Sequence, residues 1–305
     1  MQWLLEGDVS IQFQVNRDLL GQTRNDLQER IEQEGWGARL LAARNPDGTW
    51  GRGFYQPKWT SSHYTLLDLK HLQISPYHPE IRESVNFIAD NHKDDDGGIN
   101  PAKTVSRSDV CVNGMFLNYA CYFGIAEEKI HSVIDFILGQ QLKDGGFNCR
   151  SNRSGAVHSS LHTTISVVEG ILEYSSGGYT YRKDELETAA EESREFILRH
   201  RLFRSDHTGE IIHKDFLKLS FPGRWKYDIL RALDYFRDAG VKRDNRMDDA
   251  LSVLKEKRRA DGTWPLQAKH PGQVHFEMEK PGQPSRWNTL RALRVLNRFT
   301  GDEEV

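Results

Sequence analysis

The sequence predicts an all-α protein, a closed α/α toroid of about six helix hairpins that forms one domain over residues 1–305. Three observations favour this fold class. A short phrase centred on Asp-Gly recurs along the chain, and a segment with the apolar spacing of a helix follows each copy. A second, more charged helical segment then leads to the next copy. Repeated helix hairpins are typical of arrays and rings.

The Asp-Gly phrase predicts a tight turn in each repeat. Asp can bond the backbone just ahead of it and Gly allows a positive φ, while the aromatic residue or Ile that follows can plug into the core. The clear copies are ARNPDGTWG (43–51), KDDDGGI (93–99), QLKDGGF (141–147) and RRADGTW (258–264), with a weaker copy RSDHTGEI at 204–211. The acidic run within 93–99 is interpreted as a solvated loop.

Helical periodicity supplies the hairpins between these turns. The mostly apolar segments lie at 61–74, 109–123, 161–174, 224–236 and 286–299, and the segments 8–21 and 24–42 add one more pair. The amphipathic partners include 79–92, 127–142 and 184–200. An apolar helix needs burial on all sides. A ring of six such helices, with the amphipathic helices outside, provides that burial.

The composition argues against several classes of function. A net charge of −3 carries no nucleic-acid signature. No apolar run approaches the ~20 residues that span a bilayer, and the first residues do not resemble a signal peptide. Three cysteines, an odd number, indicate a reducing compartment. We therefore expect a cytoplasmic protein that acts on a small molecule, with no nucleic-acid partner and no transmembrane segment.

The loop phrases resemble those of a known superfamily. GQQLKDGGF and RRADGTWPL, placed ahead of apolar helices, are similar to the repeats of the terpenoid cyclases and the protein prenyltransferase β subunits. The repeat pattern extends over nearly the whole chain, and the loop phrases are its close matches. The resemblance implies six inner helices around a cavity that holds an isoprenoid. The inner helices lack the Asp-x-Asp-Asp acid motif of the squalene and hopene cyclases.

The prenyltransferase branch carries an Asp-x-Cys that opens one inner helix and a His-Thr that opens the next, and it holds zinc there. Asp109 and Cys111 match the first motif, and His162 matches the second, although His158 fits better by its distance from the preceding turn. The resemblance therefore implies zinc bound by Asp109, Cys111 and one of the two histidines, with Asp109 and His162 catalytic.

The same family presents basic residues to a prenyl diphosphate from the loop before the Asp-x-Cys motif. Lys103 stands at one such position, and Arg107 is adjacent to the second, which is Ser106 here. Both are predicted to bind a diphosphate-bearing substrate.

The residue chemistry leaves two interpretations of Asp109 and Cys111 open. Zinc accepts thiolate, imidazole and carboxylate ligands, and a helix N-terminus favours both anions. Alternatively, Asp109 caps the helix and Cys111 is a small core residue.

Aligning the inner helices on one another predicts a second constellation. One level holds Asp68, Asn113, Glu169, Arg231 and Arg291, and further predicted substrate-binding residues on these helices are His63, Tyr64, Tyr227, Asp228 and Trp287. The charged residues either form ion pairs between hairpins or grip an anionic group through the arginines. The aromatic residues either stack on a hydrocarbon or cation or belong to the core.

Two connections, 202–224 and 265–286, are long for a compact domain and are predicted to act as a lid or a substrate gate. They carry five ionisable residues of interest, which a solvated surface loop would explain equally: His207, His213, His270, His275 and Glu277.

Three functions are carried forward. The first is an enzyme that binds an isoprenoid or other apolar substrate in the toroid, with zinc. The second is a carbohydrate-active enzyme on a similar toroid, with Asp68 and Glu169 as acid and base. The third is a non-catalytic scaffold.

Overall fold

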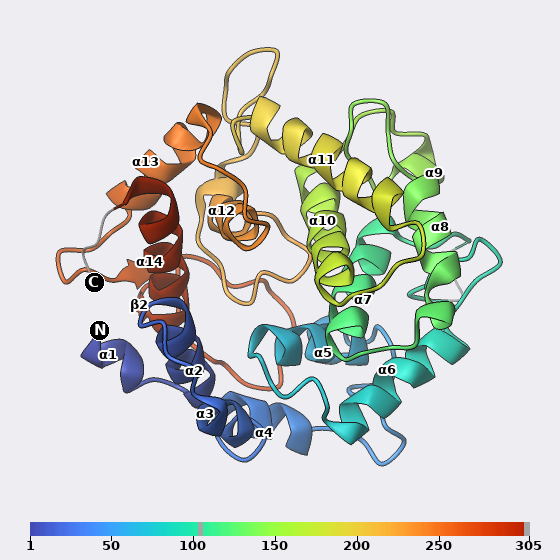
Figure 1. Ribbon diagram of the computed structural model, residues 1–305, viewed down its shortest axis with the longest axis horizontal. Helices are drawn as coiled ribbons and strands as arrows, with labels where there is room; N and C mark the ends of the chain where they lie inside the picture. The colour runs from blue at the N-terminus through green and yellow to red at the C-terminus, as the bar shows by residue number, and fades with distance from the viewer. Residues whose placement is uncertain (103–105, 302–305) are drawn as a thin grey trace. The chain divides into compact units, whose positions relative to one another are not determined.

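The computed structural model describes residues 1–102 and 106–301, and within them the chain is mostly helical (Figure 1). The prediction of an all-α protein is confirmed. The chain divides into two compact units. Unit 1 comprises Met1–Ala43, His71–Ser75 and Leu198–Val305, and unit 2 comprises Arg44–Lys70 and Pro76–Ile197. The single domain and the closure of the hairpins into a toroid stay predictions.

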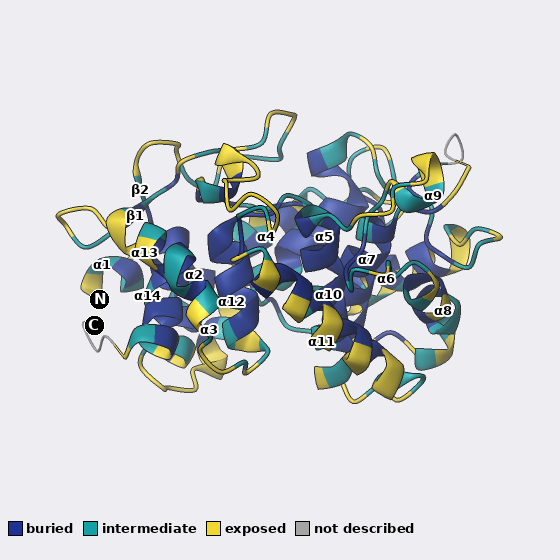
Figure 2. Cartoon of the chain, turned by 90° about the horizontal axis from the view of Figure 1, so that it is seen from above, coloured by how far each residue is buried: buried dark blue, intermediate teal, exposed yellow. Residues whose placement is uncertain are grey.

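Unit 2 is built from helix hairpins joined by Asp-Gly turns. Its elements, with the short 3-10 helices labelled η, are η1 (Lys58–Thr60), nearly all of α5 (Ser62–His71), α6 (Pro79–Asn91), α7 (Val110–Tyr122), η2 (Glu127–Lys129), α8 (His131–Gly139), α9 (Ser151–Ser154), α10 (Leu161–Ser176) and most of α11 (Lys183–Arg199). Figure 2 shows the sorting by burial: α7 is buried almost throughout, whereas α11 keeps an exposed face.

The close packing of α7 against α10 depends on two glycines. A Cβ added at Gly114 would lie 2.6 Å from the carbonyl oxygen of Ser166, and one added at Gly170 would lie 2.4 Å from the carbonyl oxygen of Gly114. The two backbones therefore touch, which only a residue without a side chain permits. This contact brings together the N-terminal ends of α7 and α10, where the predicted ligands lie.

Unit 1 combines both ends of the chain. Its elements are α1 (Gln2–Leu5), α2 (Val9–Asp18), α3 (Asn25–Arg30), α4 (Gly35–Ala42), η3 (Lys214–Leu217), α12 (Ile229–Asp238), η4 (Asn245–Met247), α13 (Asp248–Glu256), β1 (Trp264–Pro265), β2 (Pro284–Ser285) and α14 (Arg286–Thr300). Figure 1 shows α14 beside α2, near the two ends of the chain, and the two helices are in contact.

A buried ion network joins three helices of unit 1. Asp234 on α12 accepts hydrogen bonds from Arg294 at 2.7 and 2.5 Å and from Arg291 at 3.0 Å, both on α14. Arg294 also reaches Asp18 at the end of α2, at 2.7 Å. All of these side chains are at most 10 % exposed. The network ties α14 to α2 and to α12.

Each clear Asp-Gly turn is fastened to the inner helix that follows it. The backbone N–H of the buried residue after the turn donates to a side-chain oxygen on that helix, which we call the lock residue. The pairs are Trp50 with Ser62 (2.9 Å), Ile99 with Asn113 (2.6 Å), Phe147 with Thr164 (3.0 Å) and Trp264 with Thr289 (2.9 Å). The predicted plugs are confirmed, since all four donor residues are completely buried.

The predicted helix over 24–42 is divided in the structure. Gly35 has a φ of +67°, and the N–H of Trp36 donates to the Asp8 carboxylate at 2.7 Å, which starts α4 as a separate helix. Gly37 also lies against the Ile31 carbonyl, where a Cβ would come within 2.2 Å. The apolar spacing continues through the break, so periodicity alone did not reveal it.

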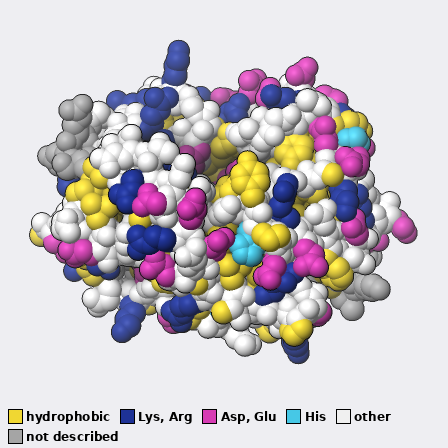
Figure 3. Space-filling model, turned by 60° about the horizontal axis from the view of Figure 1, so that its bottom comes forward, with side chains coloured by type: hydrophobic (Ala, Val, Ile, Leu, Met, Phe, Trp, Pro, Cys, Tyr) yellow, Lys and Arg dark blue, Asp and Glu magenta, His cyan; other side chains and the backbone are white. Residues whose placement is uncertain are grey.

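The described residues contain no helix that is both long and apolar enough to cross a membrane. On the face in Figure 3, basic and acidic side chains are interspersed, in keeping with 41 Lys and Arg against 44 Asp and Glu.

Candidate functional site

The candidate site lies in unit 2 where α7 begins. The lock residue Asn113 holds this helix end in place, because its amide also donates to the carbonyls of Ile99 (3.1 Å) and Asp109 (3.0 Å). Asp109 occupies the N-cap position, yet within the described chain its side chain accepts no capping hydrogen bond. The carboxylate instead forms an ion pair with Arg153, at 2.6 Å. Contrary to the capping interpretation, Asp109 therefore does not cap α7 through its side chain.

Two thiols meet beside Asp109. The N–H of Cys111 donates to the Cys149 sulfur at 3.0 Å, and the Thr163 hydroxyl lies 3.5 Å from the same sulfur. Hydrogen bonding between the thiols raises the pKa of Cys111, with burial adding to it, and lowers the pKa of Cys149. Cys149 is therefore the thiol of this pair that loses its proton more easily. Its sulfur takes the place of a cap at the start of α7.

Burial raises the pKa of the Asp109 carboxyl, and the nearby cations Arg153 and Lys58 oppose that rise without cancelling it. Only 14 % of the Asp109 side chain is exposed. An aspartic acid that holds its proton more strongly than usual can act as a proton donor.

An aromatic cluster lines the neighbouring part of α5. The hydroxyls of Tyr55 and Tyr64 lie 3.1 Å apart, and His63 contacts Phe54, Tyr55 and Tyr64 through its ring. The charges of Cys111 and Asp109 contribute, after burial, to the raised pKa of Tyr55, which places this half-buried ring near the acid and the thiols.

His63 is the fully buried centre of this cluster. Its Nδ1 lies 3.3 Å from the Tyr119 hydroxyl, and its Nε2 has no hydrogen-bond partner among the described residues. Burial lowers the pKa of His63 to about 3, so the imidazole is neutral.

The predicted zinc ligands do not fit a metal in this structure. Among the described residues, no group of three or more His, Cys, Asp or Glu side chains is arranged to hold an ion. Asp109 is engaged by Arg153, and Cys111 is paired with Cys149. His158 is exposed and His162 is half-buried. Zinc therefore stays a hypothesis, and no chemical step is derived from it.

Of the two residues predicted to bind a diphosphate, the structure describes only Arg107. Lys103 lies outside the described residues. Arg107 is exposed on the loop before α7.

The predicted level of charged residues stays a prediction, because its members belong to two separate units. Measured from the lock residues, Arg291 lies two positions, Glu169 five and Asp68 six positions further along, whereas Asn113 is itself a lock residue. The four residues therefore stand at different numbers of positions from their locks. Asp68 is buried and Glu169 is half-buried.

The two arginines that were predicted to bind substrate stabilise the structure of unit 1. Arg291 pairs with Asp234, as the ion-pair interpretation expected. Arg231 donates to the carbonyls of Arg224 (3.0 Å) and Lys226 (2.8 Å), which shapes the chain before α12. Asp228 caps α12 by accepting from the N–H of Arg231 at 2.8 Å.

The two predicted aromatic residues of unit 1 are core residues. The Tyr227 hydroxyl donates to the Leu202 carbonyl at 2.5 Å, and Trp287 stacks on Phe221 with 4.2 Å between ring centroids.

Sequence reasoning missed Cys149, Arg153, Lys58 and Tyr55. Cys149 lies two residues beyond the plug Phe147, in a loop that enters the site before α10 begins. Comparisons of the whole sequence with family models and with curated proteins give no match.

Proposed function

We propose that this chain is an enzyme of the terpenoid cyclase and prenyltransferase-like toroid class that binds an isoprenoid or another largely apolar substrate. The observation that carries the proposal is the state of Asp109. This residue sits at a helix start but makes no cap within the described chain, and it lies close to a half-buried aromatic ring. The repeated Asp-Gly turns and their buried plugs support the assignment to the class.

In this proposal Asp109 supplies the proton. Its raised pKa lets the carboxyl take up a proton more readily than an ordinary aspartate, and the ion pair with Arg153 opens when it does so. Proton donation to an alkene, or to the oxygen of a leaving group, creates positive charge on carbon. Aromatic faces attract such a charge, and in this proposal the ring that does so is Tyr55, whose raised pKa includes a contribution from the charge of Asp109. The predicted role of His162 as a second catalytic residue stays a hypothesis.

The carbohydrate-active alternative has less support. It needs two carboxyl groups that face a bound sugar and a water, and Asp68 is only 4 % exposed. The scaffold alternative differs from the proposal in one measurable property: a scaffold would convert no substrate.

The test offers the purified chain a linear polyene and a prenyl diphosphate in D₂O and follows products by mass spectrometry. We expect the polyene product to carry solvent deuterium on carbon, because the alkene takes up the proton, and we expect the prenyl diphosphate to release diphosphate. Asp109→Asn should lower the rate by roughly 10²–10⁴-fold, the range for general acids. Asp95→Asn is the matched control, because Asp95 is exposed on a loop of the same unit. The proposal fails if neither substrate is converted, or if Asp109→Asn keeps the full rate.

A further inference from the structure

A separate pocket lies in unit 1 beneath the 265–286 connection. The strands β1 and β2 close the base of this connection, pairing Trp264 with Ser285 and Pro265 with Pro284. The N–H of Gln267 donates to the Leu219 carbonyl at 2.9 Å, which fastens the connection to the segment before α12. The loop between these anchors surrounds a small pocket that is partly open to solvent.

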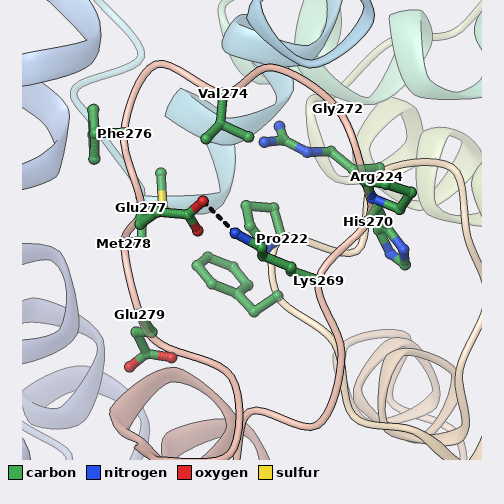
Figure 4. Close-up of a pocket in the computed structure, with 12 residues that line it drawn as sticks. Pro222, Arg224, Lys269, His270, Gly272, Val274, Phe276, Glu277, Met278 and Glu279 are labelled. Atoms are coloured by element: carbon green, nitrogen blue, oxygen red, sulfur yellow. Dashed lines mark hydrogen bonds and ion pairs between the residues drawn. The ribbon is translucent and has the colours of Figure 1, made fainter.

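Two cations enter this pocket. Figure 4 shows the side chains of Arg224 and Lys269 extending from the same side into the space that the loop surrounds. Arg224 is 6 % exposed. Lys269 reaches across the space to Glu277, at 2.5 Å, and both of these side chains are about half exposed. The ion pair therefore crosses the pocket without being buried.

The surroundings of the pocket are electropositive. Burial lowers the pKa of His270 to about 4, and the charges of Lys226, Arg224 and Arg231 contribute to that shift. His275 has a lowered pKa for the same two reasons, burial and the charge of Arg224. Several positive charges therefore converge on this end of unit 1.

The lining also carries two acidic residues, as many as its Arg and Lys residues. Glu279 is committed to α14, because it accepts hydrogen bonds from the Ser285 hydroxyl and from the N–H of Trp287. Glu277 is held by Lys269 at the mouth, where an incoming anion can replace it.

The rest of the lining is apolar. It is contributed by Phe221, Pro222, Val274, Phe276 and Met278. Phe221 is fixed by its stacking on Trp287, and Phe276 by the Arg39 guanidinium, 3.7 Å from its ring centroid. A ligand that contacts both the cations and the apolar side chains has an anionic head and an apolar body. Arg and Lys together favour a phosphate, which accepts bidentate hydrogen bonds and carries more than one charge.

We propose that this pocket binds a phosphate ester with an apolar tail, with Arg224 and Lys269 holding the phosphate. Binding displaces the Glu277 carboxylate from Lys269. The proposal goes beyond the proposed function and does not depend on it, because every residue involved belongs to unit 1 and the acid site belongs to unit 2.

Isothermal titration of the full chain with octyl phosphate tests this site, with inorganic phosphate and octanol as the two half-probes. We expect octyl phosphate to bind at least tenfold more tightly than either half-probe. Lys269→Met should weaken binding about fivefold, the upper range for one exposed charge pair. Glu277→Gln should strengthen it, because the competing carboxylate is removed. Lys242→Met, an exposed lysine of the same unit, is the matched control and should leave the affinity unchanged.

Arg224→Met should weaken binding more than tenfold, since a buried charge contact is lost. A melting curve of this variant shows whether it is folded, and the two exposed variants carry the test if it is not. Absence of octyl phosphate binding overturns the proposal. So does an unchanged affinity in Lys269→Met, or equal affinity for inorganic and octyl phosphate.

Discussion

Removal of Asp234 is the sharpest test of what holds unit 1 together. This carboxylate accepts hydrogen bonds from two arginines of α14 and is 9 % exposed. In Asp234→Ala, Arg294 keeps its ion pair with Asp18 but loses the one with α12, and Arg291 loses its ion pair with α12. Breaking a buried ion pair on one side typically costs about 3–5 kcal/mol. We expect a loss of that size in the free energy of unfolding.

Urea unfolding followed by circular dichroism measures this loss, provided that the denaturant slope is unchanged. Asp26→Ala is the matched control: its pair with Arg24 is solvent-exposed and should contribute little. A loss below about 1 kcal/mol in Asp234→Ala would refute the reasoning, because the network would then be no stronger than a surface pair.

The same carboxylate predicts the response to acid. Burial alone would raise the pKa of Asp234, but Arg294 and Arg291 outweigh it and hold the pKa far below its usual range. A group with a depressed folded-state pKa stabilises the protein fully above its unfolded pKa, about 3.9 for Asp. That contribution is lost as the pH falls through the folded pKa. We expect the difference in stability between the unaltered chain and Asp234→Asn to be constant above about pH 5 and to shrink below it. A difference that stays constant down to pH 2 would contradict this account.

Three further predictions concern unit 2. Thr164→Val should lower the free energy of unfolding by about 1–3 kcal/mol, because the buried N–H of Phe147 loses its acceptor. Urea unfolding measures this loss against a matched Thr→Val variant at an exposed position. An unchanged free energy of unfolding would show that this hydrogen bond does not stabilise the turn. Gly114→Ala should lower the free energy of unfolding by about 1–3 kcal/mol, since the added Cβ would lie 2.6 Å from the Ser166 carbonyl oxygen. An unchanged melting temperature would show that α7 and α10 can move apart without loss of stability. Elemental analysis should find no stoichiometric zinc, because the predicted ligands do not converge among the described residues; one equivalent that disappears in Cys111→Ala would restore the zinc hypothesis.

The sequence by itself determined the helical class and the repeated unit. Asp-Gly turns have a local cause, and apolar spacing marks a helix wherever the surrounding chain lies. The helices at Pro79–Asn91, Val110–Tyr122 and Arg286–Thr300 accordingly match their predicted segments within two residues at each end. The plugs Trp50 and Trp264 were predicted for the same reason.

Only the tertiary structure decided which side chains meet. Asp109 could have capped α7, but its carboxylate pairs instead with Arg153, which lies on a separate short helix. Cys149 reaches Cys111 because Gly114 and Gly170 let two helices touch, a contact between residues 56 positions apart in the chain. Hydrogen bonds and ion pairs of this kind depend on distances through space, which the order of residues along the chain does not encode locally.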